Sequence, residues 1–206
     1  MKISPKLAQL NYERFQEWHT PFKPENAKPS VFVFKGEVYV GLNVDEFSND
    51  DVAYMQNHLR ILSGLHGVLR PLDLIQPYRL EMGTKLQVAP HKDLYGFWRQ
   101  SNTFALNKVL NGNNEDILVN LSSDEYFRSI DQSKLNARII TPVFKDYKNG
   151  SYKFLSFYGK KARGMMAGFI LKNRLKKTDD IKFFEEGGYF YNENLSKDDQ
   201  FVFTRG

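Results

Sequence analysis

The stretch of sequence that decides the fold is residues 138–158, which read RIITPVFKDYKNGSYKFLSFY. Two strand-like segments, Arg138–Tyr147 and Ser151–Tyr158, flank the tripeptide Lys148-Asn149-Gly150. Asn-Gly is the strongest short hairpin signal because both residues tolerate positive φ angles. The sequence therefore predicts a β-hairpin here, followed by a long basic helix from about Lys160 to Lys176.

Further strand-like and helix-like segments surround the hairpin. Runs rich in β-branched and aromatic residues predict strands at Val31–Phe34, Val38–Val40, Ile117–Leu121, Tyr189–Tyr191 and Phe201–Phe203. The second of these runs fits a turn or a short helix equally well. Start signals and apolar spacing predict helices over Pro5–Trp18, from Ser48 to Ser63-Gly64, over Asp93–Leu110, and briefly after Ser122. Because helices and strands neither alternate strictly nor separate into blocks, we expect a single compact α+β domain over residues 1–206, with a mixed β-sheet packed by helices.

Two helix starts carry more specific predictions. Ser4 is placed to cap the first helix, and Pro5 suits its first position. The expected buried face of that helix consists of the apolar residues at helical spacing: Leu7, Leu10, Phe15 and Trp18. Ser122 and Glu125 have the spacing of a capping box, which predicts that each side chain bonds the other's backbone.

The composition excludes several classes of protein. The chain has 206 residues, enough to bury a core without disulfides or metals, and it contains no cysteine. Disulfide scaffolds, zinc ribbons, iron–sulfur clusters and thiol nucleophiles are therefore excluded. The four histidines show no metal-ligand spacing, so we expect no resident metal and no cofactor. No apolar run approaches the roughly 20 residues of a membrane span, and no secretory signal is evident, so we expect a cytoplasmic protein.

Charge is unevenly distributed along the chain. Residues 145–177 contain ten Lys and Arg and one acid, whereas residues 178–206 contain seven acids and three bases. A basic stretch of this kind favours a face that binds a polyanion, with nucleic acid as the leading candidate. A solvated helix face would explain the same charges without a ligand.

The first candidate site is the glycine-bounded turn at Ser63–Gly67. Its outline, a helix end, a short turn and a new segment, is that of a helix–hairpin–helix element. In such an element Gly64 and Gly67 would let the backbone approach a DNA phosphate, and Arg70 would add a charge-assisted contact. The alternative interpretation is an ordinary helix C-cap followed by a loop.

Two more clusters could carry chemistry. Lys160, Lys161 and Arg163 stand at the expected start of the basic helix, where the helix dipole disfavours cations and a bound phosphate would relieve the repulsion. A solvent-screened surface cluster is the alternative. Asp124 and Glu125 follow a buried strand and could bind Mg²⁺ or act as a general base, although helix capping explains them equally.

Six blocks of the sequence, in order, resemble the YaaA peroxide stress protein family. They are FKGEVY at 34–39, LSGL at 62–65, LRPLD at 69–73, PYRLEMG at 77–83, NLSSDEYF at 120–127 and SFYGKKARG at 156–164. The likeness runs from the first residue almost to the C-terminus. Family members start a few dozen residues earlier, so the resemblance implies that this chain lacks the family's N-terminal strand.

The resemblance implies a cytoplasmic bacterial protein that limits peroxide damage, lowers unincorporated iron and binds DNA through a helix–hairpin–helix element and a basic cleft. The hairpin maps onto Ser63, Gly64, Leu65 and Gly67, and the cleft onto Arg70, Lys160, Lys161 and Arg163. The expected partner is double-stranded or structured DNA, with no membrane and no obligate protein partner. An enzyme acting on nucleic acid or a phosphorylated small molecule through Asp124 and Glu125 is the alternative, and direct iron sequestration ranks third.

Overall fold

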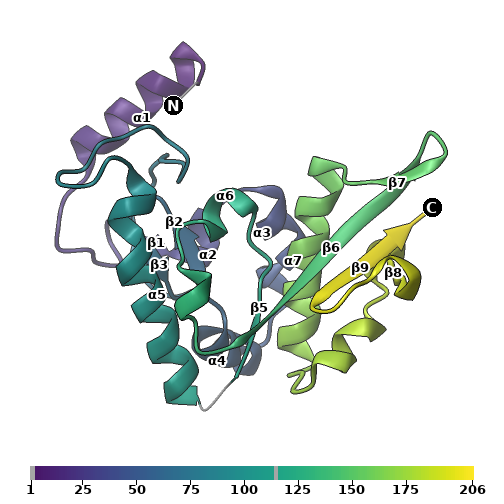
Figure 1. Ribbon diagram of the computed structural model, residues 1–206. Helices are drawn as coiled ribbons and strands as arrows, with labels where there is room; N and C mark the ends of the chain where they lie inside the picture. The colour runs from purple at the N-terminus through teal and green to yellow at the C-terminus, as the bar shows by residue number, and fades with distance from the viewer. Residues whose placement is uncertain (1–2, 114–115) are drawn as a thin grey trace. The chain divides into compact units, whose positions relative to one another are not determined.

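Helices and a mixed β-sheet make up the chain, as a computed structural model shows for residues 3–113 and 116–206 (Figure 1). The predicted α+β class is confirmed. Contacts divide the chain into two compact units, each assembled from separate segments. Unit 1 comprises Met1–Phe34, Leu59–Val109 and Ser123–Leu135, and unit 2 comprises Lys35–His58, Leu110–Ser122 and Asn136–Gly206.

The sheet of unit 2 contains the predicted hairpin. Its strands are β5 (Ile117–Val119), β6 (Arg138–Lys148), β7 (Ser151–Lys153), β8 (Phe190–Tyr191) and β9 (Gln200–Arg205). They pair in the order β5-β6-β9-β8, and β5, β6 and β9 run parallel while β8 is antiparallel to β9. Strand β7 folds back on β6 through Asn149 and Gly150, whose φ angles are 52° and 79°. The Asn-Gly hairpin and the late strands are confirmed, but the second arm of the hairpin is shorter than predicted, because β7 ends at Lys153 and α7 begins at Ser156.

Helix α7 (Ser156–Lys172) covers this sheet on the face where the even-numbered residues of β6 are buried, and α3 (Glu37–Leu42) and α4 (Asn49–His58) pack against α7. The short helices of unit 2 are η1 (Val44–Glu46), η3 (Thr178–Phe183), η4 (Glu186–Gly188) and η5 (Glu193–Leu195). Phe144 of β6 packs in one core with Ala162 and Met166 of α7. Phe184 and Phe203 stack or pack edge-to-face with Phe144 in the same core.

Glycines let α3 and α7 lie backbone to backbone. A Cβ atom at Gly164 of α7 would stand 1.8 Å from the carbonyl oxygen of Val38, and one at Gly41 of α3 would stand 2.0 Å from that of Lys161. No side chain fits at either distance. These two glycines therefore fix the position of α7, the helix that carries the predicted basic cluster.

Unit 1 is built from short strands and helices. They are α1 (Pro5–Glu17), β1 (Lys28–Pro29), α2 (Ser30–Val33), β2 (Ile61–Ser63), β3 (Gly67–Leu69), β4 (Leu74–Ile75), most of α5 (Leu94–Asn113), α6 (Asp124–Phe127) and η2 (Gln132–Lys134). Strands β1 and β4 form one antiparallel pair, and β2 and β3 form another. The predicted long helix near Asp93–Leu110 is confirmed as α5.

Several local predictions were wrong. Residues Val31–Phe34 are not a strand, because Ser30–Val33 form α2, whose Ser30 Oγ donates to two backbone carbonyls after β3. Residues 38–40 lie in α3, the helical alternative for that run. The helix that begins after Ser48 ends at His58, because Ile61–Ser63 pairs with β3 instead.

Helix α1 begins as predicted, but its apolar stripe is not buried. Ser4 Oγ accepts a hydrogen bond from the Leu7 N–H, and Pro5 is the first helical residue. The four apolar side chains expected to be buried are 36–40% exposed: Leu7, Leu10, Phe15 and Trp18. The buried residue of α1 is Asn11, whose side chain bonds the backbone of Arg79 in both directions.

Candidate nucleic-acid interface

The turn at Ser63–Gly67 is a β-hairpin turn between β2 and β3. Ser63 is buried, and its Oγ accepts hydrogen bonds from the N–H groups of Leu65 (3.2 Å) and His66 (2.8 Å). The same oxygen shares a 2.5 Å hydrogen bond with the Tyr78 hydroxyl. These two amide donors of the turn thus have a partner inside the protein.

The two glycines of this turn make room for neighbouring parts of unit 1. A Cβ atom at Gly64 would lie 2.4 Å from the Leu80 carbonyl oxygen. Gly67 has a φ of 72°, and a Cβ there would lie 2.6 Å from the Trp98 ring. The Trp98 indole N–H in turn donates to the Gly64 carbonyl at 2.9 Å. Strands flank the turn on both sides, so the helix–hairpin–helix element is not confirmed at these residues.

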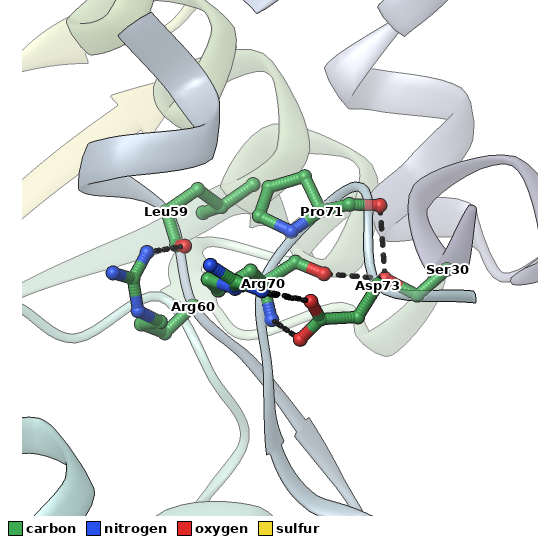
Figure 2. Close-up of polar contacts among 6 residues, drawn as sticks. All are labelled: Ser30, Leu59, Arg60, Arg70, Pro71 and Asp73. Atoms are coloured by element: carbon green, nitrogen blue, oxygen red, sulfur yellow. Dashed lines mark hydrogen bonds and ion pairs between the residues drawn. The ribbon is translucent and has the colours of Figure 1, made fainter. Parts of the chain in front are cut away.

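Two arginines and one aspartate gather at the open end of this hairpin, where Arg60 precedes β2 and Arg70 and Asp73 follow β3 (Figure 2). The Arg70 guanidinium bonds Asp73 through Nε at 3.0 Å and pairs with it through Nη2 at 2.9 Å, while the Arg70 N–H donates to the same carboxylate. Burial and the nearby charge of Arg70 lower the pKa of Arg60, whose Nη1 donates to the Leu59 carbonyl. Asp73 offsets the charge of Arg70, and Arg60 places a second positive charge close to the pair.

Electrostatics around the turn favour neutral groups. Burial lowers the pKa of His66, so its imidazole carries no charge at neutral pH. Burial also raises the pKa of Tyr78, although its hydrogen bond to Ser63 opposes the shift. Of the predicted unit 1 residues, Arg70 is therefore the cationic one.

Asp124 and Glu125 begin α6 in unit 1, and both are exposed. The Glu125 Oε1 atom accepts the Gly83 N–H at 2.9 Å, so this carboxylate ties α6 to the loop before Thr84. This bond replaces the predicted reach of Glu125 back to Ser122. Burial, followed by the charge of Glu125, raises the pKa of the adjacent Tyr126 to about 12.

Helix α7 begins earlier than predicted. Its first residue is Ser156, so Lys160 and Lys161 lie in the second turn rather than at the N-terminus. The helix dipole falls off within the first turn, which removes the predicted repulsion as an argument for a bound anion. Both lysines are nevertheless exposed, while Arg163 is half-buried with its guanidinium 5.6 Å from the centre of the Phe154 ring.

The hairpin adds cations to those of α7. Side chains alternate along a strand, and the register pairs Lys148 with Ser151 and Asp146 with Lys153. Lys148 and Lys153 therefore lie on the same face as Asp146 and Phe144, which is the face that α7 covers. We call this the hairpin–helix surface and define it by Lys148, Lys153, Phe157, Tyr158, Lys160, Lys161 and Arg163; Figure 1 shows β7 leading directly into α7.

The acid nearest in the sequence to the cations of the hairpin–helix surface is used internally. Asp146, the single acid between residues 145 and 177, is buried and pairs with Arg205 through Nε at 2.8 Å. It also accepts the Tyr189 hydroxyl at 2.9 Å. Within residues 3–113 and 116–206, no acidic side chain lies at ion-pair distance from the four surface lysines: Lys148, Lys153, Lys160 and Lys161.

Arg205 also holds an exposed aromatic ring of this surface. Its guanidinium lies 4.6 Å from the centre of the buried Tyr189 ring and 4.7 Å from that of Tyr158. Tyr158 is 45% exposed and packs edge-to-face with Phe157, which is 58% exposed. Two ordered aromatic rings are thus presented to solvent among cations.

A comparison with models of protein families identifies the family of this chain. The model of a family described as peroxide stress protein YaaA matches residues 1–195. The chain belongs to this family. The family name supports a role in peroxide stress, and the resemblance seen in the six sequence blocks is confirmed.

The predicted site residues of this YaaA-family chain fall in both units. Unit 1 holds Ser63, Gly64, Leu65, Gly67, Arg70, Asp124 and Glu125, and unit 2 holds Lys160, Lys161 and Arg163. Sequence reasoning missed Lys148, Lys153 and the aromatic residues. Alternation on either side of Asn149-Gly150 was the signal that would have placed both lysines on one face. None of the helices in the described part of the chain is long and apolar enough to cross a membrane.

Proposed function

We propose that this YaaA-family protein binds DNA through the hairpin–helix surface as part of its role in peroxide stress. The observation that carries the proposal is the internal use of Asp146, which leaves lysines on both the hairpin and α7 without an acidic neighbour. Several cations on one face attract a polyanion over a long range and release its counterions on binding. The partner is double-stranded or structured DNA, as the sequence led us to expect.

The aromatic residues support nucleic acid over a small anion. Phe157 and Tyr158 are exposed on the same helix as Lys160 and Lys161, and nucleic-acid-binding proteins combine such rings with cations so that bases stack while phosphates meet charge. Arg205 holds Tyr158 before any ligand arrives, so less conformational entropy is lost on binding. Phosphate contacts of this kind position a duplex without reading its sequence.

Residues of unit 1 enter the proposal as a separate contact. Arg70 and the turn formed by Ser63, Gly64, Leu65 and Gly67 were predicted to bind phosphate, and the Arg60–Arg70 pair supplies the charge for it. The bonds that Ser63 makes to the turn give these residues a structural part as well. Because Arg70 already pairs with Asp73, its contribution to affinity should be smaller than that of an unpaired lysine.

The salt dependence of binding tests the proposal. Duplex binding of the wild-type chain should weaken steeply with salt, and Lys160→Ala, Lys161→Ala and Arg163→Ala together should flatten the slope of log K against log salt by up to about 2.7, at about 0.9 for each phosphate contact. The matched control removes three cations at and just beyond the C-terminal end of α7: Lys172→Ala, Lys176→Ala and Lys177→Ala. An equal effect of the two triple variants would show that general charge, not this surface, binds DNA.

Lowering of free iron in a cytoplasmic setting completes the proposed role. It rests on the family resemblance alone. Spin-resonance measurement of unincorporated iron in peroxide-treated cells, with and without the protein, tests it, and fractionation of those cells tests the location. Equal iron levels in both strains would refute this part while leaving DNA binding intact.

The alternative activity is an enzyme with Asp124 as base or metal ligand. Its test is turnover on a panel of nucleic acids and phosphorylated small molecules, compared with Asp124→Asn. Asp124 is the better probe because Glu125 also bonds the Gly83 backbone, so its loss would disturb the loop as well as any chemistry. Turnover that disappears in Asp124→Asn would favour the enzyme.

A further inference from the structure

The chain contains two Asn-Gly pairs in different backbone settings. Asn149-Gly150 forms the exposed turn between β6 and β7, and Asn111-Gly112 lies in the last turn of α5. All four residues are exposed, so access to water does not distinguish the pairs. The two pairs differ in the conformation and the hydrogen bonding of the peptide between Asn and Gly.

We propose that Asn149 is a site of spontaneous deamidation that places a carboxylate on the hairpin–helix surface. In the first step the backbone nitrogen of Gly150 loses its proton and attacks the side-chain carbonyl carbon of Asn149. A carbon–nitrogen bond forms, the side-chain carbon–nitrogen bond breaks, and ammonia leaves with the proton, which gives a cyclic imide. Water then adds to one of the two imide carbonyls and opens the ring to aspartate or isoaspartate.

The hairpin turn leaves the reacting groups accessible. The strand register ends at Lys148 and Ser151, so Asn149 and Gly150 lie outside the ladder of β6 and β7. A Cβ atom at Gly150 would have no heavy atom within 4 Å, so ring closure meets no crowding from the rest of the chain. Lys148, two residues before Gly150, adds a positive charge to this turn, which favours loss of the proton from the Gly150 nitrogen.

The helical pair has equally open surroundings, because a Cβ atom at Gly112 would also have no heavy atom within 4 Å, but its peptide is held in a helix. In an α-helix each N–H donates to the carbonyl four residues earlier, and α5 extends through Asn113. The Gly112 nitrogen is therefore held in the helical bond pattern, and its proton is shared with a carbonyl. The two pairs have the same chemistry in the unfolded chain and different chemistry in the folded one.

The consequence for DNA binding rests on the proposed function. A carboxylate at residue 149 stands next to Lys148 and would offset one cation of the hairpin–helix surface. Loss of one phosphate contact lowers the salt slope by about 0.9. The modification cannot be reversed by a change in salt or pH, because a new bond has been made, so it would record the age of the protein molecule.

The first experiment measures the modification itself. The purified full chain is incubated at neutral pH and body temperature, digested and analysed by peptide mass spectrometry, with isoaspartyl methyltransferase labelling to mark the isomer. We expect conversion at Asn149 to exceed conversion at Asn111 at least severalfold in the folded chain, and the two rates to converge in concentrated urea. Equal rates in the folded chain, or an intact Asn149, would overturn the proposal.

The second experiment measures the effect on DNA binding. Asn149→Asp should lower the salt slope of duplex binding by about one phosphate contact, and Asn111→Asp, the same change outside the surface, should not. If the wild-type chain fails to bind DNA, the proposed function fails while the mapped modification stands. If the wild type binds and the two variants behave alike, the modification has no bearing on this surface and its inferred role is refuted.

Discussion

Removal of the Asp146 carboxylate should destabilise unit 2 more than removal of any exposed acid. The side chain of Asp146 is 8% exposed and that of Arg205 is 31% exposed, so the pair is largely withdrawn from water. In Asp146→Ala the buried Tyr189 hydroxyl loses its acceptor, which costs about 1–2 kcal/mol, and Arg205 loses its partner, which costs about 2 kcal/mol at this partial exposure. We expect the free energy of unfolding to fall by about 3–4 kcal/mol.

The assay must report on unit 2 alone. Both tryptophans, Trp18 and Trp98, belong to unit 1, so their fluorescence follows the other part of the chain. Native-state hydrogen exchange of the β6 and β9 amides, read by mass spectrometry, follows the affected sheet directly. Tyr189→Phe provides a milder variant that keeps the ion pair and should cost about 1 kcal/mol.

The control is the exposed ion pair at the other end of β6. Arg138 and Asp199 pair at 2.6 Å with side chains 54% and 43% exposed, so Asp199→Ala should have only a small effect on the same amides. Equal losses from Asp146→Ala and Asp199→Ala would refute the reasoning, because burial would then have no influence on the strength of the pair.

Two further predictions concern helix packing and alkaline pH. Gly164→Ala should separate α3 from α7 and lower the melting temperature strongly, because its Cβ would collide with the Val38 carbonyl. The control, Gly112→Ala in α5, meets no atom within 4 Å and should be neutral or stabilising by up to about 1 kcal/mol. A calorimetric scan in which Gly112→Ala melts at the lower temperature would contradict the packing. The raised pKa of Tyr126 means that the folded state holds this proton more tightly than the unfolded state, so its stability contribution is complete below pH 10 and is lost as pH rises towards about 12. Urea unfolding across that range should therefore show a shallower alkaline decline for Tyr126→Phe than for the wild type, and parallel curves would argue against the shift.

Sequence reasoning succeeded where the bonding partners are close in the chain. The φ angles at Asn149 and Gly150 follow from those two residues alone. Ser48 and Asp51 cap α4 with bonds across three residues, and Ser4 caps α1 in the same way. Such local signals placed α1, α5 and the hairpin correctly.

The errors came from contacts that are distant in the chain. Val31–Phe34 has strand-like residues, but Ser30 bonds carbonyls about forty positions away and the segment becomes helical. The apolar spacing of α4 continues into Ile61–Ser63, but these residues form β2 because they pair with β3. Helical spacing also says nothing about whether a partner covers the stripe, which is why Leu7 and Trp18 were wrongly expected to be buried.

The candidate site shows the same division. The exposure of Lys160 and Lys161 could be predicted from charge alone, because residues 145–177 contain ten bases and one acid, so few of these bases can pair with an acid nearby in the sequence. The burial of Asp146 depends on its ion pair with Arg205, which lies almost sixty residues later in the chain. No pattern in the sequence around Asp146 indicates this pair. The structural use of Ser63 and Gly64 was hidden for the same reason, since Tyr78 and Trp98 are their partners.

The interior position of β9 constrains how the protein is made. This strand lies between β6 and β8, and Phe203 completes the aromatic cluster around Phe144. A ribosome releases β6 before it releases Gln200–Arg205, so the nascent chain carries an open strand edge and an unfilled core until its last residues are made. A message that stops short of Gln200 would therefore yield an aggregation-prone product rather than a weakened one, and cells should dispose of it by proteolysis.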